Sequence, residues 1–167
     1  SIVFAVLSLI RRDPSFGATD TPSAALYARY KPVIAKVDPQ KMHDLLPMLF
    51  MAKFDPYDSV REVMRELWDS LVPAEYQHLT VLLQGTILAF LAKQLYSVVW
   101  RDREAACLAL ENFLVRRSWK QVRPCLVYMW TAGLKVLDDV RDSTRMASLG
   151  FIKCLSDQVL RASNPQE

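Results

Sequence analysis

The stretch Asp-Pro-Tyr-Asp-Ser-Val-Arg at residues 55–61 returns as Asp-Val-Arg-Asp-Ser-Thr-Arg at residues 139–145. A weaker copy, Ser-Val-Val-Trp-Arg-Asp-Arg, stands midway between them at residues 97–103. All three copies end in an arginine, and these arginines are spaced 42 residues apart. A period of this length indicates a repeat protein. The same step upstream reaches Asp-Pro at residues 13–14, where the arginine position holds Thr19, so the first repeat is predicted to be degenerate.

Each copy separates two segments with helical periodicity. Before the first full copy, apolar residues at three- and four-residue steps form one stripe: Met42, Leu45, Leu46, Leu49 and Phe50. After it, a second stripe contains Val60, Val63, Met64, Leu67, Trp68 and Leu71. Pro47 predicts a kink or a late start in the first helix, and Pro73 predicts the end of the second. Asp58 or Ser59 is expected to cap the second helix.

The remaining helices are predicted from the same pattern. We expect them at residues 79–95, 104–115, 119–137 and 142–160, with the degenerate pair at residues 2–10 and 24–37 and a loop between them at residues 12–23. No segment alternates with the period of a strand. The sequence therefore predicts an all-α chain with eight helices in four antiparallel pairs.

Pairs of about 40 residues bury their apolar faces only against neighbouring pairs. The expected fold is a HEAT/armadillo-type α-α superhelix, a solenoid made of one segment, residues 1–167. Its units are expected at about residues 1–38, 39–73, 74–117 and 118–162, followed by a short tail at 163–167. The repeated acidic and basic residues predict a structural ladder, in which aspartates accept from free N–H groups and arginines reach the next unit: Asp55, Arg61, Arg103, Asp139 and Arg145.

Composition excludes several classes of protein. A hydrophobic fraction of 51% with 23% charged residues is typical of a globular chain, and only 4 glycines disfavour a β-rich fold. The net charge of +3 is spread over both signs, so no nucleic-acid partner is expected. The most apolar segment, residues 79–95, contains Gln84 and Lys93, which predicts a buried helix rather than a membrane span. The chain begins Ser-Ile-Val-Phe without methionine, and we expect it to be an internal piece of a longer protein.

Catalytic and metal sites lack their usual residue patterns. The two histidines, His43 and His78, lie 35 positions apart, and neither stands in a ligand cluster. Cys107, Cys125 and Cys154 are widely spaced in apolar helical patterns, which predicts buried thiols in a reducing compartment. No phosphate-binding glycine motif is present. We therefore expect no enzyme activity, no cofactor and no small-molecule substrate; a helical enzyme with an unrecognised carboxylate pair is the alternative from another class.

Tryptophans are the best candidates for protein contacts, since they are enriched at interface hot spots. Trp68 and Trp130 lie on apolar stripes and are expected in the core. Two others lie near predicted helix starts beside basic residues, which gives the candidate contact set Trp100, Arg101, Arg116, Arg117 and Trp119. The alternative for the arginine pair is a cationic helix end that offsets the helix dipole.

The Asp-Pro-x-x-x-Val-Arg pattern resembles HEAT repeats in general. Several motifs in order resemble one family, the large proteasome-associated adaptor and scaffold proteins: Phe-Asp-Pro at 54–56 followed by Trp68 and Leu-Val at 71–72, Trp-Arg-x-Arg-Glu at 100–104 leading into Cys-Leu-Ala-Leu at 107–110, and Trp130 followed by Asp-Asp at 138–139 and Arg145. The resemblance covers about residues 45–155. The chain departs from it at Asp102 and Thr144, where valine is usual before the arginine.

The resemblance implies a scaffold segment that binds the 26S proteasome, tethers its core and regulatory particles, and links proteasomes to other machinery. Its implied partners are proteasome subunits, and its implied location is the cytoplasm and nucleus. The alternative is a HEAT-repeat segment of an unrelated scaffold, such as a transport receptor or a microtubule-associated protein.

Overall fold

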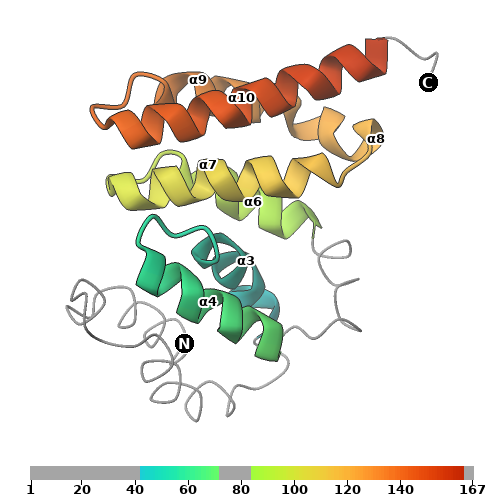
Figure 1. The fold of residues 1–167 in the computed structure, drawn as a ribbon. Helices are drawn as coiled ribbons and strands as arrows, with labels where there is room; N and C mark the ends of the chain where they lie inside the picture. Colours follow the sequence, from blue (N-terminus) through green and yellow to red (C-terminus); the bar gives the residue numbers. More distant parts are fainter. Residues whose placement is uncertain (1–41, 72–83, 164–167) are drawn as a thin grey trace. The chain divides into compact units, whose positions relative to one another are not determined.

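The computed structural model describes residues 42–71 and 84–163, and every regular element in those ranges is helical (Figure 1). The all-α prediction is confirmed, and the packed helices are in line with a solenoid. The expected first pair at residues 2–10 and 24–37, its loop, and the start of the 79–95 helix lie outside the described residues. The chain divides into two compact units, residues 1–87 and 88–167. The finer repeat boundaries stay a prediction.

In the first unit, α3 (Met42–Ala52) packs against α4 (Asp58–Leu71). The helix α3 continues through Pro47, so the predicted late start is wrong. Phe50 and Trp68 meet edge to face with ring centroids 5.5 Å apart, and the Lys53 ammonium lies 4.3 Å from the Trp68 ring centroid. Trp68 is 5% exposed, as expected for a core residue.

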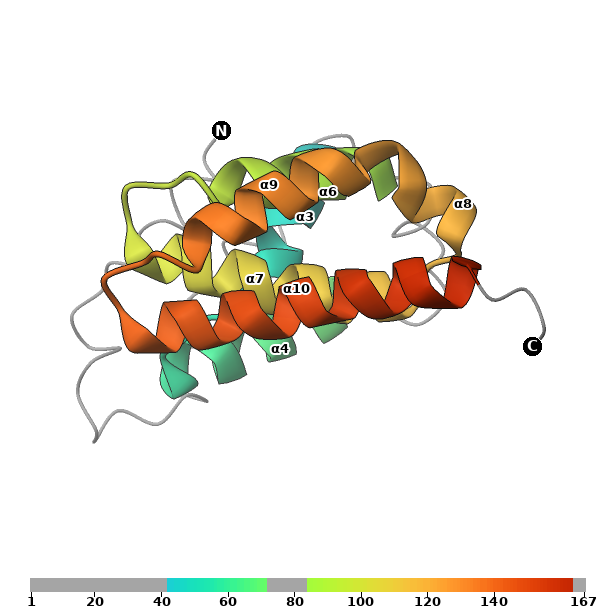
Figure 2. The same cartoon turned by 90° about the horizontal axis from the view of Figure 1, so that it is seen from above.

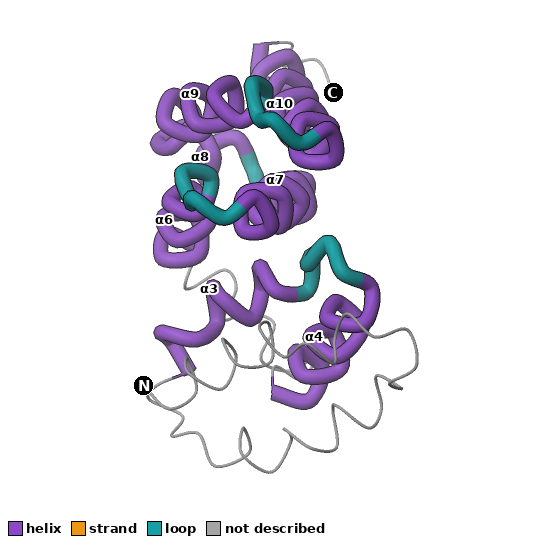
Figure 3. The backbone as a smooth tube through the Cα atoms, turned by 90° about the vertical axis from the view of Figure 1, so that its left-hand side faces the viewer, coloured by secondary structure: helices purple, strands orange, loops and turns teal. Residues whose placement is uncertain are grey.

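The second unit contains most of α6 (Gln84–Gln94), whose first turn belongs to the first unit, together with α7 (Trp100–Val115), α9 (Leu126–Val136) and α10 (Asp142–Ser163). Figures 2 and 3 show α6 and α9 in one layer and α7 and α10 in the other. The helices α7 and α10 run side by side in the same direction, while α9 returns antiparallel to α10 (Figure 1). Corresponding helices of successive repeats therefore stack on each other, which is how a repeat array builds a continuous core.

The helix expected at residues 119–137 is broken, which corrects the prediction. It consists of α8 (Trp119–Val122), a 3₁₀ turn η4 (Arg123–Cys125) and α9. Pro124 has no N–H group and its ring clashes with the preceding turn of an α-helix, so the chain tightens here before α9 begins. The helix α7 begins at Trp100, four residues before the expected Glu104.

Small residues bring α9 and α10 close together. A Cβ atom on Gly133 of α9 would lie 2.6 Å from Ile152 Cδ1 and 2.9 Å from Phe151 Cε1. Phe151 is fully buried, and the Ser148 hydroxyl donates to the Gly133 carbonyl over 2.7 Å. The side chains of α10 thus occupy the space that a larger residue at position 133 would need.

None of the helices in residues 42–71 and 84–163 is long and apolar enough to cross a bilayer.

Candidate functional site

The turns that join the helices of each pair share one hydrogen bond. In every copy, Nη1 of the repeated arginine donates to the main-chain carbonyl six residues earlier: Arg61 to Asp55 over 2.9 Å, Arg103 to Ser97 over 2.8 Å, and Arg145 to Asp139 over 2.8 Å. These carbonyls lie in the turns, three residues after the preceding helices end at Ala52, Gln94 and Val136. The arginine on the following helix supplies a donor, which explains why an arginine recurs in every copy.

The first residue of each copy holds the turn through its side chain. It accepts a hydrogen bond from the N–H two residues later: Tyr57 N to Asp55 Oδ1 over 3.0 Å, Val99 N to Ser97 Oγ over 3.1 Å, and Arg141 N to Asp139 Oδ1 over 3.0 Å. Serine does this like aspartate, though more weakly. Ser97 thus belongs to the ladder, although the predicted set omitted it.

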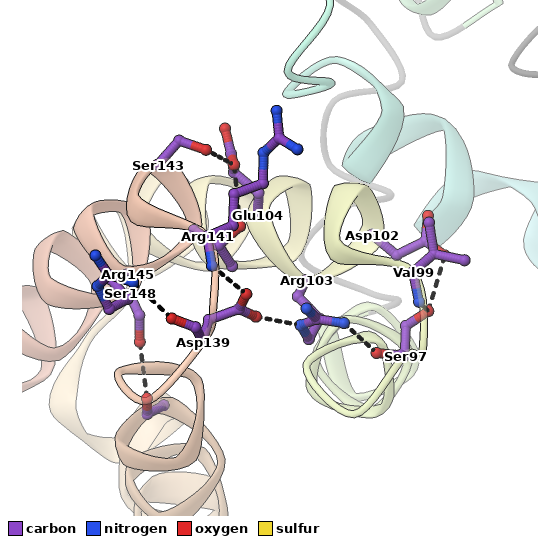
Figure 4. A network of polar contacts seen from close by, with 12 residues as sticks. Ser97, Val99, Asp102, Arg103, Glu104, Asp139, Arg141, Ser143, Arg145 and Ser148 are labelled. Atoms are coloured by element: carbon purple, nitrogen blue, oxygen red, sulfur yellow. Dashed lines mark hydrogen bonds and ion pairs between the residues drawn. The ribbon is translucent and has the colours of Figure 1, made fainter.

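One arginine reaches the next repeat. Arg103 Nε on α7 contacts Asp139 Oδ2 in the turn before α10 over 2.5 Å (Figure 4). The pair is withdrawn from solvent, with side-chain exposures of 18% for Arg103 and 3% for Asp139. The hydrogen bond from Arg103 is the main cause that lowers the pKa of Asp139, and the Arg141 N–H lowers it further, whereas burial opposes both. This contact joins two repeats through paired charges.

Trp100 makes a second contact across the same boundary. The Arg141 guanidinium carbon lies 3.6 Å from its ring centroid, a cation–π geometry. Trp100 is half-buried, and Arg141 covers one face of the indole. The structure therefore gives this candidate contact residue a role in holding α7 to the turn before α10.

The buried Glu104 connects α7 with α10. It is 8% exposed, and its Oε2 accepts hydrogen bonds from Ser143 Oγ over 2.6 Å and Thr144 Oγ1 over 3.2 Å (Figure 4). Thr144 departs from the valine of the repeat because its hydroxyl serves this carboxylate. Asp102, the other departure, accepts from Ser97 Oγ over 3.0 Å. Both departures are thus parts of one polar network.

The five candidate contact residues fall into two groups. Trp100 and Arg101 begin α7, while Arg116, Arg117 and Trp119 lie at its far end, about 24 Å away for a helix of 16 residues. Arg116 is exposed; Arg117 and Trp119 are half-buried. The Arg117 guanidinium lies 4.2 Å from the Phe113 ring centroid, and burial, followed by Arg116, lowers its pKa. The structure does not bring all five together.

The cysteines are held as thiols. Burial raises the pKa of Cys107 to about 12, and it also raises the pKa of Cys125 and Cys154. Cys107 is fully buried as predicted, but Cys125 and Cys154 are only half-buried. Trp130, expected in the core, is also half-buried.

Within residues 42–71 and 84–163, no group of three or more His, Cys, Asp or Glu residues is placed to hold a metal ion. His78 lies outside these ranges.

Comparison with known proteins gives consistent matches. The chain is 33% identical over 121 residues to the human proteasome adapter and scaffold protein ECM29, which is 72% of this chain. It is 30% identical over 128 residues to proteasome component ecm29 of Schizosaccharomyces pombe and 29% identical over 126 residues to that of Saccharomyces cerevisiae, each covering 75% of the chain. The chain is homologous to a segment of the ECM29 proteins.

The matched segment spans 6% to 7% of the length of these ECM29 relatives. The similarity to the proteasome adaptor and scaffold family, expected from the ordered tryptophan, aspartate and arginine motifs, is confirmed. No family model matches the chain. No solved structure matches it either.

The ladder was incompletely predicted from the sequence. Three of its contacts come from residues that the predicted set lacks: Ser97, Glu104 and Thr144. The 42-residue step from Asp55 to position 97 and on to Asp139 points to Ser97, which shares their turn-capping ability. Glu104 has a counterpart 42 residues earlier in Glu62, but its contacts with Ser143 and Thr144 depend on the packing of α7 against α10, which the repeat does not show.

Proposed function

We propose that this chain is a segment of a scaffold that binds the 26S proteasome, tethers its core and regulatory particles, and links proteasomes to other machinery. The observation that supports this proposal is the similarity to ECM29 proteins over 72% to 75% of the chain. These relatives are named proteasome adapter, scaffold and component. The stacked helices agree with such a role, because a solenoid offers an extended surface to its partners.

The chain acts through binding rather than catalysis. The buried carboxylates of the described residues have structural partners. Asp55 accepts from the Tyr57 N–H, Asp139 accepts from Arg103, and Glu104 accepts from hydroxyls on α10. The thiols are held in the protonated form, which is not the nucleophilic one. Within residues 42–71 and 84–163, these carboxylates and thiols are thus engaged in packing. The proposed location is the cytoplasm and nucleus, and imaging of the fluorescently tagged intact protein tests it.

A pull-down of the tagged intact protein from cell extract, with quantitative mass spectrometry, tests the proteasome assignment. We expect core-particle and regulatory-particle subunits in stoichiometric amounts. An unrelated tagged HEAT-repeat protein of similar size, expressed at the same level, controls for nonspecific capture. A preparation that lacks proteasome subunits but enriches other partners would overturn the proposal and favour a segment of a transport receptor or a microtubule-associated protein.

A further inference from the structure

One side of α9 is exposed along its whole length. Val127, Thr131 and Leu134 follow each other at steps of four and three residues and are exposed. The exposures are 78% for Val127 and 45% for Leu134, and 51% for the adjacent Tyr128. The opposite side is buried and contains Met129, Ala132, Gly133 and Val136. Figures 2 and 3 place α9 at the outside of the layer that it shares with α6. Apolar side chains are thus presented on a regular helix face.

The segment that contains this face is rich in positive charge, with the exposed Asp138 just beyond its end. Residues 112–137 contain five lysines and arginines and no aspartate or glutamate. Three of these cations are exposed: Lys120 on α8, Arg123 on η4 and Lys135 on α9. We call these three residues, together with Val127, Tyr128 and Leu134, the basic outer face. Its cations stand toward both ends and its apolar residues lie between them along the chain.

An aromatic pair extends the basic outer face toward the end of α6. The rings of Tyr96 and Tyr128 lie 6.2 Å apart, and Lys135 Nζ lies 4.9 Å from the Tyr96 ring centroid. Tyr96 is 42% exposed. Tyrosine offers a large, rigid contact area at a low entropy cost, and it is enriched at binding hot spots. These contacts fix the rings before any partner arrives.

The exposed leucines of α10 lack this charge pattern. Leu149 and Leu160 on α10 are 50% and 63% exposed. The cations near them, Lys153 and Arg161, line a groove together with Asp157 and Glu111. A surface with balanced charges does not select the charge of its partner. The basic outer face, in contrast, has an excess of positive charge beside its apolar residues.

We propose that the basic outer face binds an acidic amphipathic segment of a protein partner. Apolar side chains of that segment pack on Val127, Tyr128 and Leu134, and its carboxylates pair with the cations at either end. Aliphatic residues between the cations favour a protein over a nucleic acid, whose phosphates attract a contiguous basic block. This inference rests on the proposed scaffold function and specifies the chemistry of one contact.

The test uses the intact protein and a synthetic helical peptide with leucine on one face and glutamate on its flanks. Fluorescence anisotropy measures binding to the wild type and to the triple variant Lys120→Glu, Arg123→Glu, Lys135→Glu. We expect affinity to fall by more than about tenfold in the variant, because attraction becomes repulsion. The matched control Lys93→Glu, Lys153→Glu, Arg161→Glu changes three exposed cations elsewhere and is expected to keep its affinity. Glutamine in place of glutamate at the three face positions gives a milder variant, and circular dichroism checks the folding of each.

Each outcome bears on one proposal. Equal peptide affinity in the wild type and the triple variant would overturn the proposed binding role of the basic outer face, even if proteasome subunits co-purify with both proteins. So would a preference for the same peptide with lysine flanks, or for a DNA oligonucleotide that the triple variant no longer binds. The wild type could fail to co-purify with proteasomes while its peptide binding still needs the three cations. That result would overturn the proteasome assignment and support peptide binding by the basic outer face.

Discussion

The turn before α7 and the turn before α10 share the same hydrogen bonds between side chains and the backbone, yet their arginines pair with different carboxylates. In the turn before α10, Arg145 Nη2 pairs with Asp142 on its own helix over 2.7 Å. In the turn before α7, the equivalent of Asp142 is Trp100. Arg103 finds no carboxylate there and contacts Asp139 of the next repeat. The first copy follows the local pattern, since Arg61 pairs with Asp58.

The comparison shows how the residue three positions before the repeated arginine decides whether that arginine pairs within its own helix or with the next repeat. An exposed pair three residues apart on a helix contributes little, because water screens it and two long side chains must be ordered. Asp142 is 83% exposed, whereas Asp139 is 3% exposed. Replacing the local carboxylate by Trp100 therefore leaves Arg103 for a buried contact and adds an aromatic face for Arg141. The weakest copy in sequence thus makes a buried ion pair with the next repeat.

The largest effect is expected for Asp139→Ala. This change removes the turn cap and leaves Arg103 largely buried without its main partner, so α7 and α10 should lose about 3 kcal/mol of stability. Hydrogen exchange of the amides in these two helices measures the free energy of opening. The matched control is Asp142→Ala, which breaks an exposed pair and should cost about 0.5 kcal/mol. Equal losses in the two variants would contradict the distinction between the turns.

A smaller effect is expected for Trp100→Asp, which gives the turn before α7 the local carboxylate of its neighbour. Loss of the Arg141 contact and of half-buried aromatic area should cost about 2 kcal/mol. The new carboxylate should also draw Arg103 away from Asp139. A double-mutant cycle between Arg103→Ala and Asp139→Ala, measured with and without the change at position 100, tests this. An unchanged coupling energy would mean that position 100 does not set the reach of Arg103.

Acid should weaken the contact between Arg103 and Asp139, with a smaller loss of stability than Trp100→Asp causes. The pKa of Asp139 lies below its ordinary value of 3.8, chiefly because Arg103 donates to the carboxylate. The contribution to stability is therefore complete above that ordinary value and is lost as pH falls through the lower, folded-state value. The difference in opening free energy between wild type and Asp139→Asn should shrink over this range. A difference that stays constant would show that the charge of Asp139 does not stabilise the contact.

The fold was largely predictable because it depends on periodic features. The three- and four-residue apolar steps located α3 and α4, and the 42-residue repeat located the turns. The break at Pro124 was missed, although a proline inside a helical pattern signals such an ending. The apolar stripe continues on both sides of this proline, and the continuous pattern outweighed the local signal. Periodicity thus predicts which face is buried better than it predicts where a helix is interrupted.

The contacts of residues that depart from the repeat pattern were harder to predict. Thr144 and Asp102 stand where the repeat favours valine, and the sequence alone gives them no partner. The structure supplies the partners, Glu104 for Thr144 and Ser97 for Asp102. Side chains 40 residues apart meet only once the helices are stacked. The charge of residues 112–137 is visible in the sequence, but the exposed side of α9 that makes the basic outer face is visible only in the structure.

The smallest effect is expected for Ser97→Asp, which gives the middle copy the residue of the other two. A carboxylate at position 97 would still accept from the Val99 N–H, but it would face Asp102, whose Oδ2 now accepts from the serine hydroxyl over 3.0 Å. Repulsion between two partly exposed carboxylates should cost about 1 kcal/mol. Adding Asp102→Val, the residue usual in the repeat, should restore the lost stability. Hydrogen exchange at the start of α7 compares the single and double variants, and a loss that persists in the double variant would show that the serine hydroxyl itself is needed.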